Sequence, residues 1–575
     1  LVDENSTAVS RQQVALVVAH ELAHQWFGNL VTMKWWDDLW LNESFANMME
    51  YVSVNAIEPS WNIFEDFQTT GVPLALKRDA TDGVQSVHVE VKHPDEINTL
   101  FDPAIVYAKG SRLMHMLRRW LGDDAFRKGL KAYFEKHQYG NTIGRDLWNA
   151  LGDASGRDVA AFMDSWLEQP GYPVLTAVVE NDTLKISQKQ FFIGEHEDQG
   201  RQWVVPLNSN WSGIPDTLET ETLEIPGYAA LAAENSEPLR FNTENTAHYI
   251  TDYQGELLDA IVDNMASLDN LSKQQILQER RLLAESGVIS YASLLPVIEK
   301  LTQETSYLVV SAVSSILQGL SLFVDEGTEV EAAYKKLLVT FNQFNFERLG
   351  FEPKAGEADE DEMVRQFVIS NMIKGDDAKA SAKASEIYAA HAEDISKLPA
   401  AIRLQILINQ IKHHESKELT DLYLNTYAQA TDGNFKRQLS TALAYTTDAD
   451  TVEKILTEWK NKDVVKPQDL AMSWYFTFLH HEFTQESAWT WARENWEWVK
   501  AALGGDMSFD KFVIYPANTF KTAERLAEFK AFFEPQLSDM AISRNISMGI
   551  KEIAARVDLI QREKAAVEAA ILATK

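Results

Sequence analysis

The spacing of apolar residues changes twice along the chain, and these changes limit the folds that it can adopt. Apolar residues recur at helical spacing through residues 1–172. Residues 173–252 instead carry short alternating runs, and helical spacing returns in residues 253–575. The sequence Pro-Gly-Tyr-Pro at residues 170–173 stops any helix at the first change. The sequence therefore predicts a multidomain, predominantly α protein with three domains divided at these positions.

The middle segment has the features of a small β-sandwich. Two alternating strands joined by a turn at Asn181 and Asp182 are predicted in LTAVVENDTLKISQKQFFI. Short strands and turn residues continue in RQWVVPLNSNW, TLETETLEIPG and PLRFNTENTAHYI. A run of short strands of this length is typical of two small packed sheets.

The last segment has the rhythm of stacked helical hairpins and is repeat-like, although it has no clean repeat period. Its longest uncharged run, residues 306–324, has the length of a membrane span. Because this run contains several serines, and its apolar residues recur at helical spacing, we predict a buried helix. The acidic run Glu357–Glu362 is predicted to be a solvated loop between helices.

Composition excludes several classes of function. The 575 residues are 45% hydrophobic and 24% charged, the profile of a globular protein. A formal net charge of −32 argues against nucleic acid and anionic membrane surfaces as partners. The chain has no cysteine, which excludes disulfides, thiol catalysis and thiolate metal sites. The lack of cysteine fits a reducing compartment, and we expect a cytoplasmic protein.

Two histidines flank a glutamate in VVAHELAHQWFGNL. Ser10 and Gln13 form a capping-box pattern that predicts the start of a helix, and Gly28 suits its end. His20 and His24 are four residues apart on this helix, so both imidazoles can reach one zinc ion at about 2.0–2.1 Å. The pattern alone also fits two histidines that have no metal.

A third ligand favours the metal site. A second helix is predicted near Asn42 in WWDDLWLNESFANMMEY, and Glu43 lies near its start. Residues 25–42 provide enough chain for a loop and an antiparallel return. Two histidines and a glutamate leave the fourth zinc position open for water, which is the arrangement of a catalytic site. We therefore predict one Zn²⁺ held by His20, His24 and Glu43.

The segments HELAH and WLNES, with the spacing between them, resemble the zinc aminopeptidases of the aminopeptidase N type, a gluzincin group. The resemblance extends over essentially the whole chain. It implies a thermolysin-like, mostly helical catalytic domain, followed by a β-sandwich and a helical C-terminal domain. It also implies a hydrolase that removes N-terminal residues from peptides with a free N-terminus.

The resemblance assigns roles to two further residues. Glu21 matches the general base of the family, and Tyr107, in VYAKG, matches its catalytic tyrosine. By spacing alone, Tyr107 would be interpreted as a packed helical aromatic residue. Asn47 and Glu50 follow Glu43 on the same helical face, where they can orient the metal ligands or simply face solvent.

The sequence departs from the family in one respect. Members carry the motif G-x-M-E-N before the zinc helix, and its glutamate holds the α-amine of the substrate. The motif is absent from the 575 residues, so the resemblance implies an incomplete catalytic domain. Because misplaced substrate can cost about a hundredfold in rate, we expect this chain alone to be weak or inactive.

Two other functions remain open at this stage. One is a related hydrolase of the family, such as an epoxide hydrolase, although nothing in the sequence favours it. The other is a non-catalytic binding protein built on the helical segment, which would be expected to lose ligands or the base. The preferred N-terminal residue and the oligomeric state are not predicted.

Overall fold

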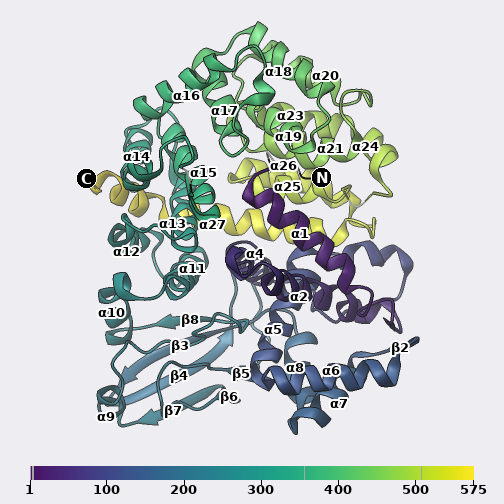
Figure 1. Ribbon diagram of the computed structural model, residues 1–575, viewed down its shortest axis with the longest axis vertical. Helices are drawn as coiled ribbons and strands as arrows, with labels where there is room; N and C mark the ends of the chain where they lie inside the picture. The colour runs from purple at the N-terminus through teal and green to yellow at the C-terminus, as the bar shows by residue number, and fades with distance from the viewer. Residues whose placement is uncertain (1, 3–5, 355, 507, 575) are drawn as a thin grey trace. The chain divides into compact units, whose positions relative to one another are not determined.

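The computed structural model describes residues 2, 6–354, 356–506 and 508–574, and most of these residues are helical (Figure 1). Contacts within the chain divide it into two compact units. Val9–Ile316 forms the first unit, and the second consists of the chain from Leu317 onward together with a few residues before Val9. The prediction of a multidomain, mostly helical protein is confirmed.

The first unit contains the predicted catalytic and sandwich segments. Its helices are α1 (Ala8–Ala23), α2 (Trp40–Ile57), α3 (Phe64–Thr69), α4 (Gly71–Asp79), α5 (Gly110–Leu121), α6 (Asp123–His137), α7 (Gly144–Ser155), α8 (Val159–Leu167), α9 (Tyr228–Ala233), α10 (Glu256–Asp263), α11 (Asn270–Ser286), α12 (Leu295–Ile298) and most of α13 (Tyr307–Leu320). Its strands are β1 (Val31–Met33), β2 (Gly140–Thr142), β3 (Pro173–Glu180), β4 (Thr183–Gln190), β5 (Val205–Pro206), β6 (Thr217–Leu218), β7 (Thr222–Pro226) and β8 (Ile250–Tyr253).

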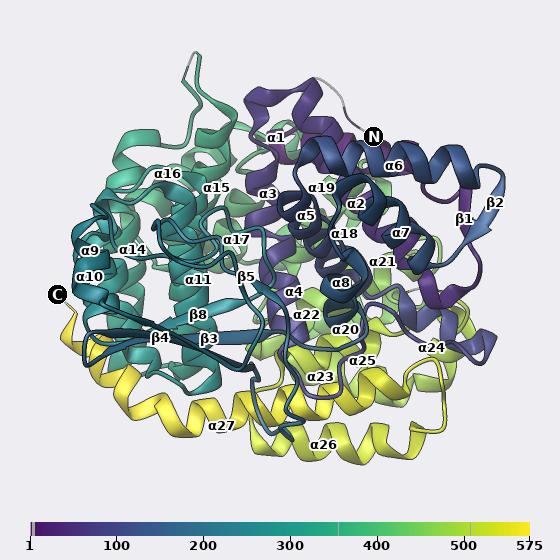
Figure 2. The same cartoon turned by 90° about the horizontal axis from the view of Figure 1, so that it is seen from below.

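The second unit consists of helices. They are α14 (Glu329–Leu349), α15 (Asp359–Lys374), α16 (Ala378–Ala390), α17 (Arg403–His414), α18 (Lys417–Gln429), α19 (Gly433–Leu443), α20 (Ala449–Glu458), α21 (Pro467–Asp469), α22 (Phe476–Leu479), α23 (Glu482–Glu494), α24 (Trp496–Leu503), α25 (Lys511–Thr519), α26 (Ala523–Phe533) and α27 (Ser543–Ala573). The long α27 packs against α14, α25 and α26, and Figure 2 shows it beside α26. Consecutive helices such as α16 and α17 pack as hairpins.

The largest sheet has the strand order β7-β4-β3-β8 (Figure 1). β3 and β4 form the predicted hairpin, in which Glu180 pairs with Thr183 across a two-residue turn. Asn181 and Asp182 have φ angles of 50° and 59°, as a tight hairpin turn requires. β8 joins β3 in parallel, after a long excursion of the chain. The predicted hairpin and its turn are confirmed.

The rest of the middle segment has less strand than predicted. β5 and β6 form a separate two-stranded sheet, and PLRFNTENTAHYI contributes only the start of β8. Asn242 and Asn245 have positive φ angles in this segment, and the buried Asn242 side chain bonds the backbone of Ala247. These amides replace ladder hydrogen bonds with local ones, which explains why an alternating pattern forms turns here.

Two predictions in the helical segment have different outcomes. The apolar run 306–324 forms α13, whose Val309, Ile316 and Leu320 are at most 1% exposed, so the buried helix is confirmed. The acidic run is not a loop throughout, because α15 begins at Asp359 and takes residues 359–362 as its first turn. Carboxylates are favourable there because the helix dipole is positive at this end.

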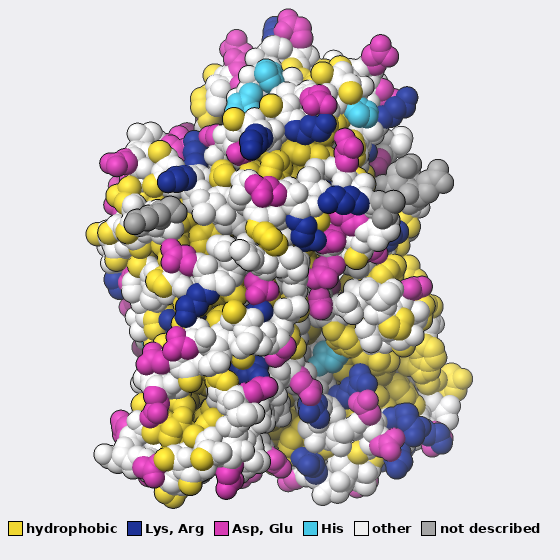
Figure 3. Space-filling model, turned by 60° about the vertical axis from the view of Figure 1, so that its left-hand side comes forward, with side chains coloured by type: hydrophobic (Ala, Val, Ile, Leu, Met, Phe, Trp, Pro, Cys, Tyr) yellow, Lys and Arg dark blue, Asp and Glu magenta, His cyan; other side chains and the backbone are white. Residues whose placement is uncertain are grey.

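Charged side chains of both signs are distributed over the molecular face shown in Figure 3, with apolar side chains between them. No helix in the described part of the chain is both long and apolar enough to cross a membrane.

Candidate metal centre

The helix that carries the two histidines differs in its limits from the prediction. α1 begins at Ala8, so Ser10 lies inside it and is not its N-cap, and regular helix ends at Ala23 instead of near Gly28. His24 is therefore the first residue after α1. A turn follows in which Gly28 has a φ of 138°, a conformation that favours glycine. This turn leads back to α2, which carries Glu43 in its first turn.

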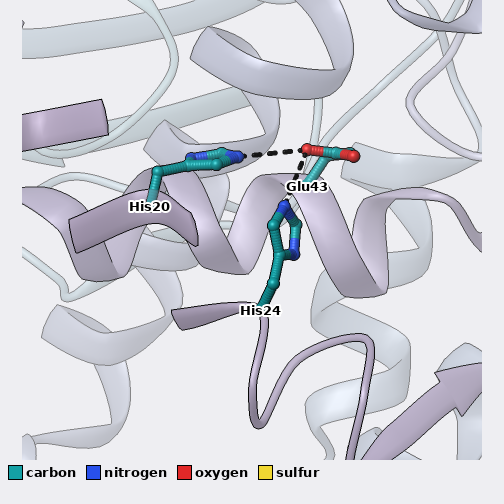
Figure 4. Close-up of side chains that lie close together, drawn as sticks. All are labelled: His20, His24 and Glu43. Carbon is teal, nitrogen blue, oxygen red and sulfur yellow. Dashed lines mark hydrogen bonds and ion pairs between the residues drawn. The ribbon is translucent and has the colours of Figure 1, made fainter. Parts of the chain in front are cut away.

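His20, His24 and Glu43 converge on one point (Figure 4). The Nε2 atoms of His20 and His24 lie 3.3 and 3.5 Å from the same carboxylate oxygen, Oε2 of Glu43. The ligand atoms of all three residues lie within 4.8 Å of one another. Among the described residues, no other group of three histidines or acidic residues is arranged in this way.

Both imidazoles are oriented by their other nitrogen. His20 Nδ1 lies 2.8 Å from Oε2 of Glu50, and His24 Nδ1 lies 3.0 Å from the backbone oxygen of Phe27. An ionised carboxylate and a carbonyl only accept hydrogen bonds, so each Nδ1 donates and each Nε2 is the ring atom that faces Glu43 and can bind a metal once it has lost its proton. The sequence indicated Glu50 as an orienting residue, whereas the role of the Phe27 carbonyl has no sequence signal.

Asn47 and Glu50 act together. The Asn47 amide donates to Oε1 of Glu50 at 2.9 Å, while Oε2 accepts from His20. Burial raises the pKa of Glu50, in spite of its hydrogen bond with His20. This pair fixes the plane of the His20 ring, which is the arrangement that supports metal-binding histidines in proteins.

The three converging groups shift one another's protonation. Burial lowers the pKa of His20, but hydrogen bonds to Glu43 and Glu50 outweigh it and raise that pKa to about 9. Burial would raise the pKa of Glu43, yet both histidines hold it down at about 2. The hydrogen bond to Glu43 also raises the pKa of His24. In the absence of a metal, the carboxylate thus attracts protons to the imidazoles at the positions where a cation would bind.

Tyr107 lies beside this group in a π-helix, η4 (Pro103–Lys109), and not in regular α-helix. Its ring centroid is 6.0 Å from that of His20. Burial raises the pKa of Tyr107, and the carboxylates of Glu43 and Glu21 raise it further. The phenol therefore stays protonated at neutral pH and is available as a hydrogen-bond donor.

Glu21 lies outside the converging group. Its side chain is exposed and is not one of the three that converge, although its charge acts on Tyr107. This position next to the group agrees with the geometry of the helix, where residue 21 is rotated by about a hundred degrees from residue 20.

The contacts that hold η4 in place were not predicted from the sequence. Asp102 caps its first turn by accepting from the backbone N–H of Ala104 at 2.8 Å. At its other end, the Lys109 ammonium lies 2.8 Å from the carboxylate of Asp79, and both side chains are fully buried. A Cβ atom on Gly110 would overlap the Ser44 side chain, so this position requires glycine for close packing on α2.

Comparison with known proteins defines the class to which this centre belongs. Residues 1–166 match the peptidase family M1 domain, and residues 239–555 match the ERAP1-like C-terminal domain. The chain therefore belongs to peptidase family M1 and is a peptide hydrolase.

Its relatives include bacterial aminopeptidases. The chain is 66% identical to the aminopeptidase N of Lactococcus lactis subsp. lactis over 99% of its own length and 67% of that protein. The aminopeptidase N of Lactobacillus helveticus is 45% identical over 99% of this chain and 68% of its own length. A more distant relative is the Tricorn protease-interacting factor F2 of Thermoplasma acidophilum, 34% identical over 69% of this chain and 51% of that protein.

Proposed function

We propose that the chain is a zinc-dependent aminopeptidase in which His20, His24 and Glu43 bind one Zn²⁺. The observation that carries the proposal is the spacing of the ligand atoms. Ligands at about 2.0–2.1 Å from a tetrahedral zinc ion lie about 3.3 Å apart. The two imidazole nitrogens lie 3.3 and 3.5 Å from the Glu43 oxygen, and a cation bound there would replace the protons that Glu43 attracts to them. Neutral imidazole and carboxylate are ligands that zinc prefers.

Bound at these residues, zinc would supply a Lewis acid that polarises the peptide carbonyl and makes a water molecule more acidic. In this proposal, Glu21 accepts a proton from the attacking water and delivers it to the leaving amine. Glu21 follows the proposed ligand His20 directly in the sequence, and its side chain is exposed to solvent. The Tyr107 hydroxyl donates a hydrogen bond to the carbonyl oxygen as negative charge develops there. Glu50 and Asn47 hold the His20 ring and do not take part in proton transfer.

The substrates that we propose are peptides with a free N-terminus, as the names of the relatives suggest. The test is release of anilide from L-aminoacyl anilides by the zinc-loaded chain. Glu21→Gln keeps the shape of the side chain but removes the base, and should lower kcat about 10²–10⁴-fold without changing the zinc content. Full activity in this variant would exclude Glu21 as the base.

The expectation that this chain alone is weak or inactive depends on the family's G-x-M-E-N motif, which does not occur in the 575 residues. The anilide assay of the isolated chain decides it. If activity is low, adding in trans the part of the lactococcal relative that this chain does not match should raise kcat/KM. A fully active chain would contradict the expectation and would show that other residues hold the α-amine.

We also propose three domains at 1–172, 173–252 and 253–575, and a cytoplasmic location. The domain limits are supported by the change to strands at Pro173 and the return to helices at Glu256. The sandwich requires that the four-stranded sheet and the β5–β6 sheet pack face to face. Limited proteolysis with mass spectrometry of the fragments tests the limits, and cell fractionation tests the location.

A further inference from the structure

A cavity of about 550 Å³ lies in the first unit, away from the candidate metal centre. It is lined mainly by α3, α5 and the loop of residues 244–246, and none of the metal-centre residues contributes to it. Its volume falls in the range of sites for small organic molecules, about 300–1,000 Å³. Its lining combines aromatic rings with several arginines, which raises the question of what it binds.

Arg112 is the central feature of this lining. Its side chain is 1% exposed. Its Nε and Nη2 atoms donate to the backbone oxygen of Ala247, and Nη2 also donates to the Asn245 side chain at 2.8 Å. The third nitrogen, Nη1, has no hydrogen-bond partner among the described residues. All the partners of this guanidinium are neutral.

The positive charge of Arg112 is therefore not compensated by an ion pair. The carboxyl group that acts on it electrostatically is that of Glu279. Burial raises the pKa of Glu279 to about 8, so this group is mostly protonated at neutral pH. Burial also lowers the pKa of Arg112 to about 10, which leaves the guanidinium charged. A buried charge without a counter-ion is costly, and an anion that reaches it would remove that cost.

Two further polar groups of the lining lack partners. Nε2 of His115 and Oγ1 of Thr246 are buried and have no hydrogen-bond partner among the described residues. Burial lowers the pKa of His115 to about 3, so its ring is neutral and adds no charge. The rings of Phe64 and Phe67 pack against His115, with centroids 5.4 and 5.7 Å away, and provide an apolar wall.

The other arginines of the cavity are already paired. Arg118 binds both carboxylate oxygens of Asp123, at 2.7 and 3.0 Å. Arg119 pairs with Glu244 at 2.7 Å at the exposed rim. The lining as a whole holds three arginines and three acidic residues, and Arg112 is the arginine whose hydrogen-bond partners among the described residues are all neutral. A site of this kind suits a single negative charge better than a phosphate dianion.

We propose that this cavity binds a small carboxylate with an apolar body. The carboxylate pairs with Arg112 and accepts from Thr246, and the apolar part lies against Phe64 and Phe67. A planar carboxylate matches the donor geometry of a guanidinium. Binding requires a small rearrangement of the lining, because Nη1 of Arg112 is shielded from solvent.

The test is calorimetric titration of the whole chain with phenylacetate, benzylamine and inorganic phosphate. Phenylacetate should bind with a 1:1 stoichiometry. Benzylamine, which carries a positive charge on a similar apolar body, should not bind, and neither should phosphate. Arg112→Met should weaken phenylacetate at least tenfold. Because this buried substitution can impair folding, Thr246→Val serves as a second variant. It should lower the affinity for phenylacetate severalfold. Arg145→Gln, which breaks an exposed ion pair with Asp164 elsewhere, is the matched control and should change nothing.

A carboxylate could instead bind at the metal centre. The titration is therefore repeated with His20→Ala, which removes a proposed zinc ligand without touching the cavity. Unchanged phenylacetate affinity supports the cavity, whether or not the chain hydrolyses peptides. Three outcomes would overturn the proposal. They are loss of phenylacetate binding in His20→Ala, tighter binding of phosphate than of phenylacetate, and a phenylacetate affinity of Arg112→Met and Thr246→Val equal to that of the parent chain.

Discussion

Ser44 donates a hydrogen bond of 2.6 Å to the backbone oxygen of Val106. Ser44 directly follows Glu43, and Val106 directly precedes Tyr107, so this single bond joins the helix of the third proposed ligand to the π-helix of the proposed oxyanion donor. π-helical turns are uncommon and are frequent at functional sites. The bond is buried and fixes the separation between Glu43 and Tyr107.

Substitution of Ser44 should therefore lower activity without loss of metal. Ser44→Ala removes the hydrogen bond and leaves the Val106 carbonyl unpaired, so that η4 is free to shift relative to α2. Because a small misplacement of a catalytic group can cost up to about a hundredfold, we expect kcat to fall about 10–100-fold. Zinc content, measured by atomic absorption, should stay at one per chain. An unchanged kcat would show that other contacts position Tyr107.

Glu50 should control metal affinity instead. Glu50→Gln keeps the volume of the side chain but weakens the acceptor that orients His20 Nδ1. Loss of such an orienting partner typically costs about 10–100-fold in metal affinity, so competition with a zinc chelator should show a Kd raised by this factor. Glu58→Gln, at the exposed C-terminal end of α2, is the matched control. Equal zinc affinity in both variants would contradict the orienting role.

The sequence predicted the parts of this molecule that depend on local spacing. The hairpin at Asn181 and Asp182 follows from turn chemistry. The convergence of His20, His24 and Glu43 follows from two helices joined by a connection that is short enough to bring them together. The limits of α1 were not predictable, because Ser10 is compatible with either a cap or a helix interior, and more distant packing decides between them. The π-helix at Tyr107 was not predictable from the sequence, since two contacts with distant segments hold it: Ser44 donates to Val106, and Asp79 pairs with Lys109.

A buried ion pair should make a large contribution to stability. Lys109, Asp79 and His248 are fully buried, and the carboxylate lies 2.8 Å from the ammonium and 2.9 Å from the imidazole. Lys109→Met leaves Asp79 charged and deprived of its main counter-ion, which typically costs about 3–5 kcal/mol. Urea unfolding followed by circular dichroism should show this loss in the first unit. A loss below about 1 kcal/mol would mean that His248 and the Gly171 N–H are sufficient partners for Asp79.

Stability should also depend on pH through Glu279. Burial raises its pKa to about 8 in the folded chain, well above the ordinary value of a glutamate. Between the unfolded pKa of about 4.3 and pH 8, the folded state keeps a proton that the unfolded state has lost, so the contribution of Glu279 to stability decreases as pH rises. Glu279→Gln does not titrate. The difference in unfolding free energy between this variant and the parent chain should therefore shift in favour of the variant by about 3–4 kcal/mol from pH 5 to pH 8. Denaturant titrations at several pH values measure this shift.

His248 changes stability in the opposite direction, since burial lowers its pKa to about 4, but it is present in both chains and cancels in the difference. A difference that stays constant with pH would show that Glu279 is ionised in the folded chain.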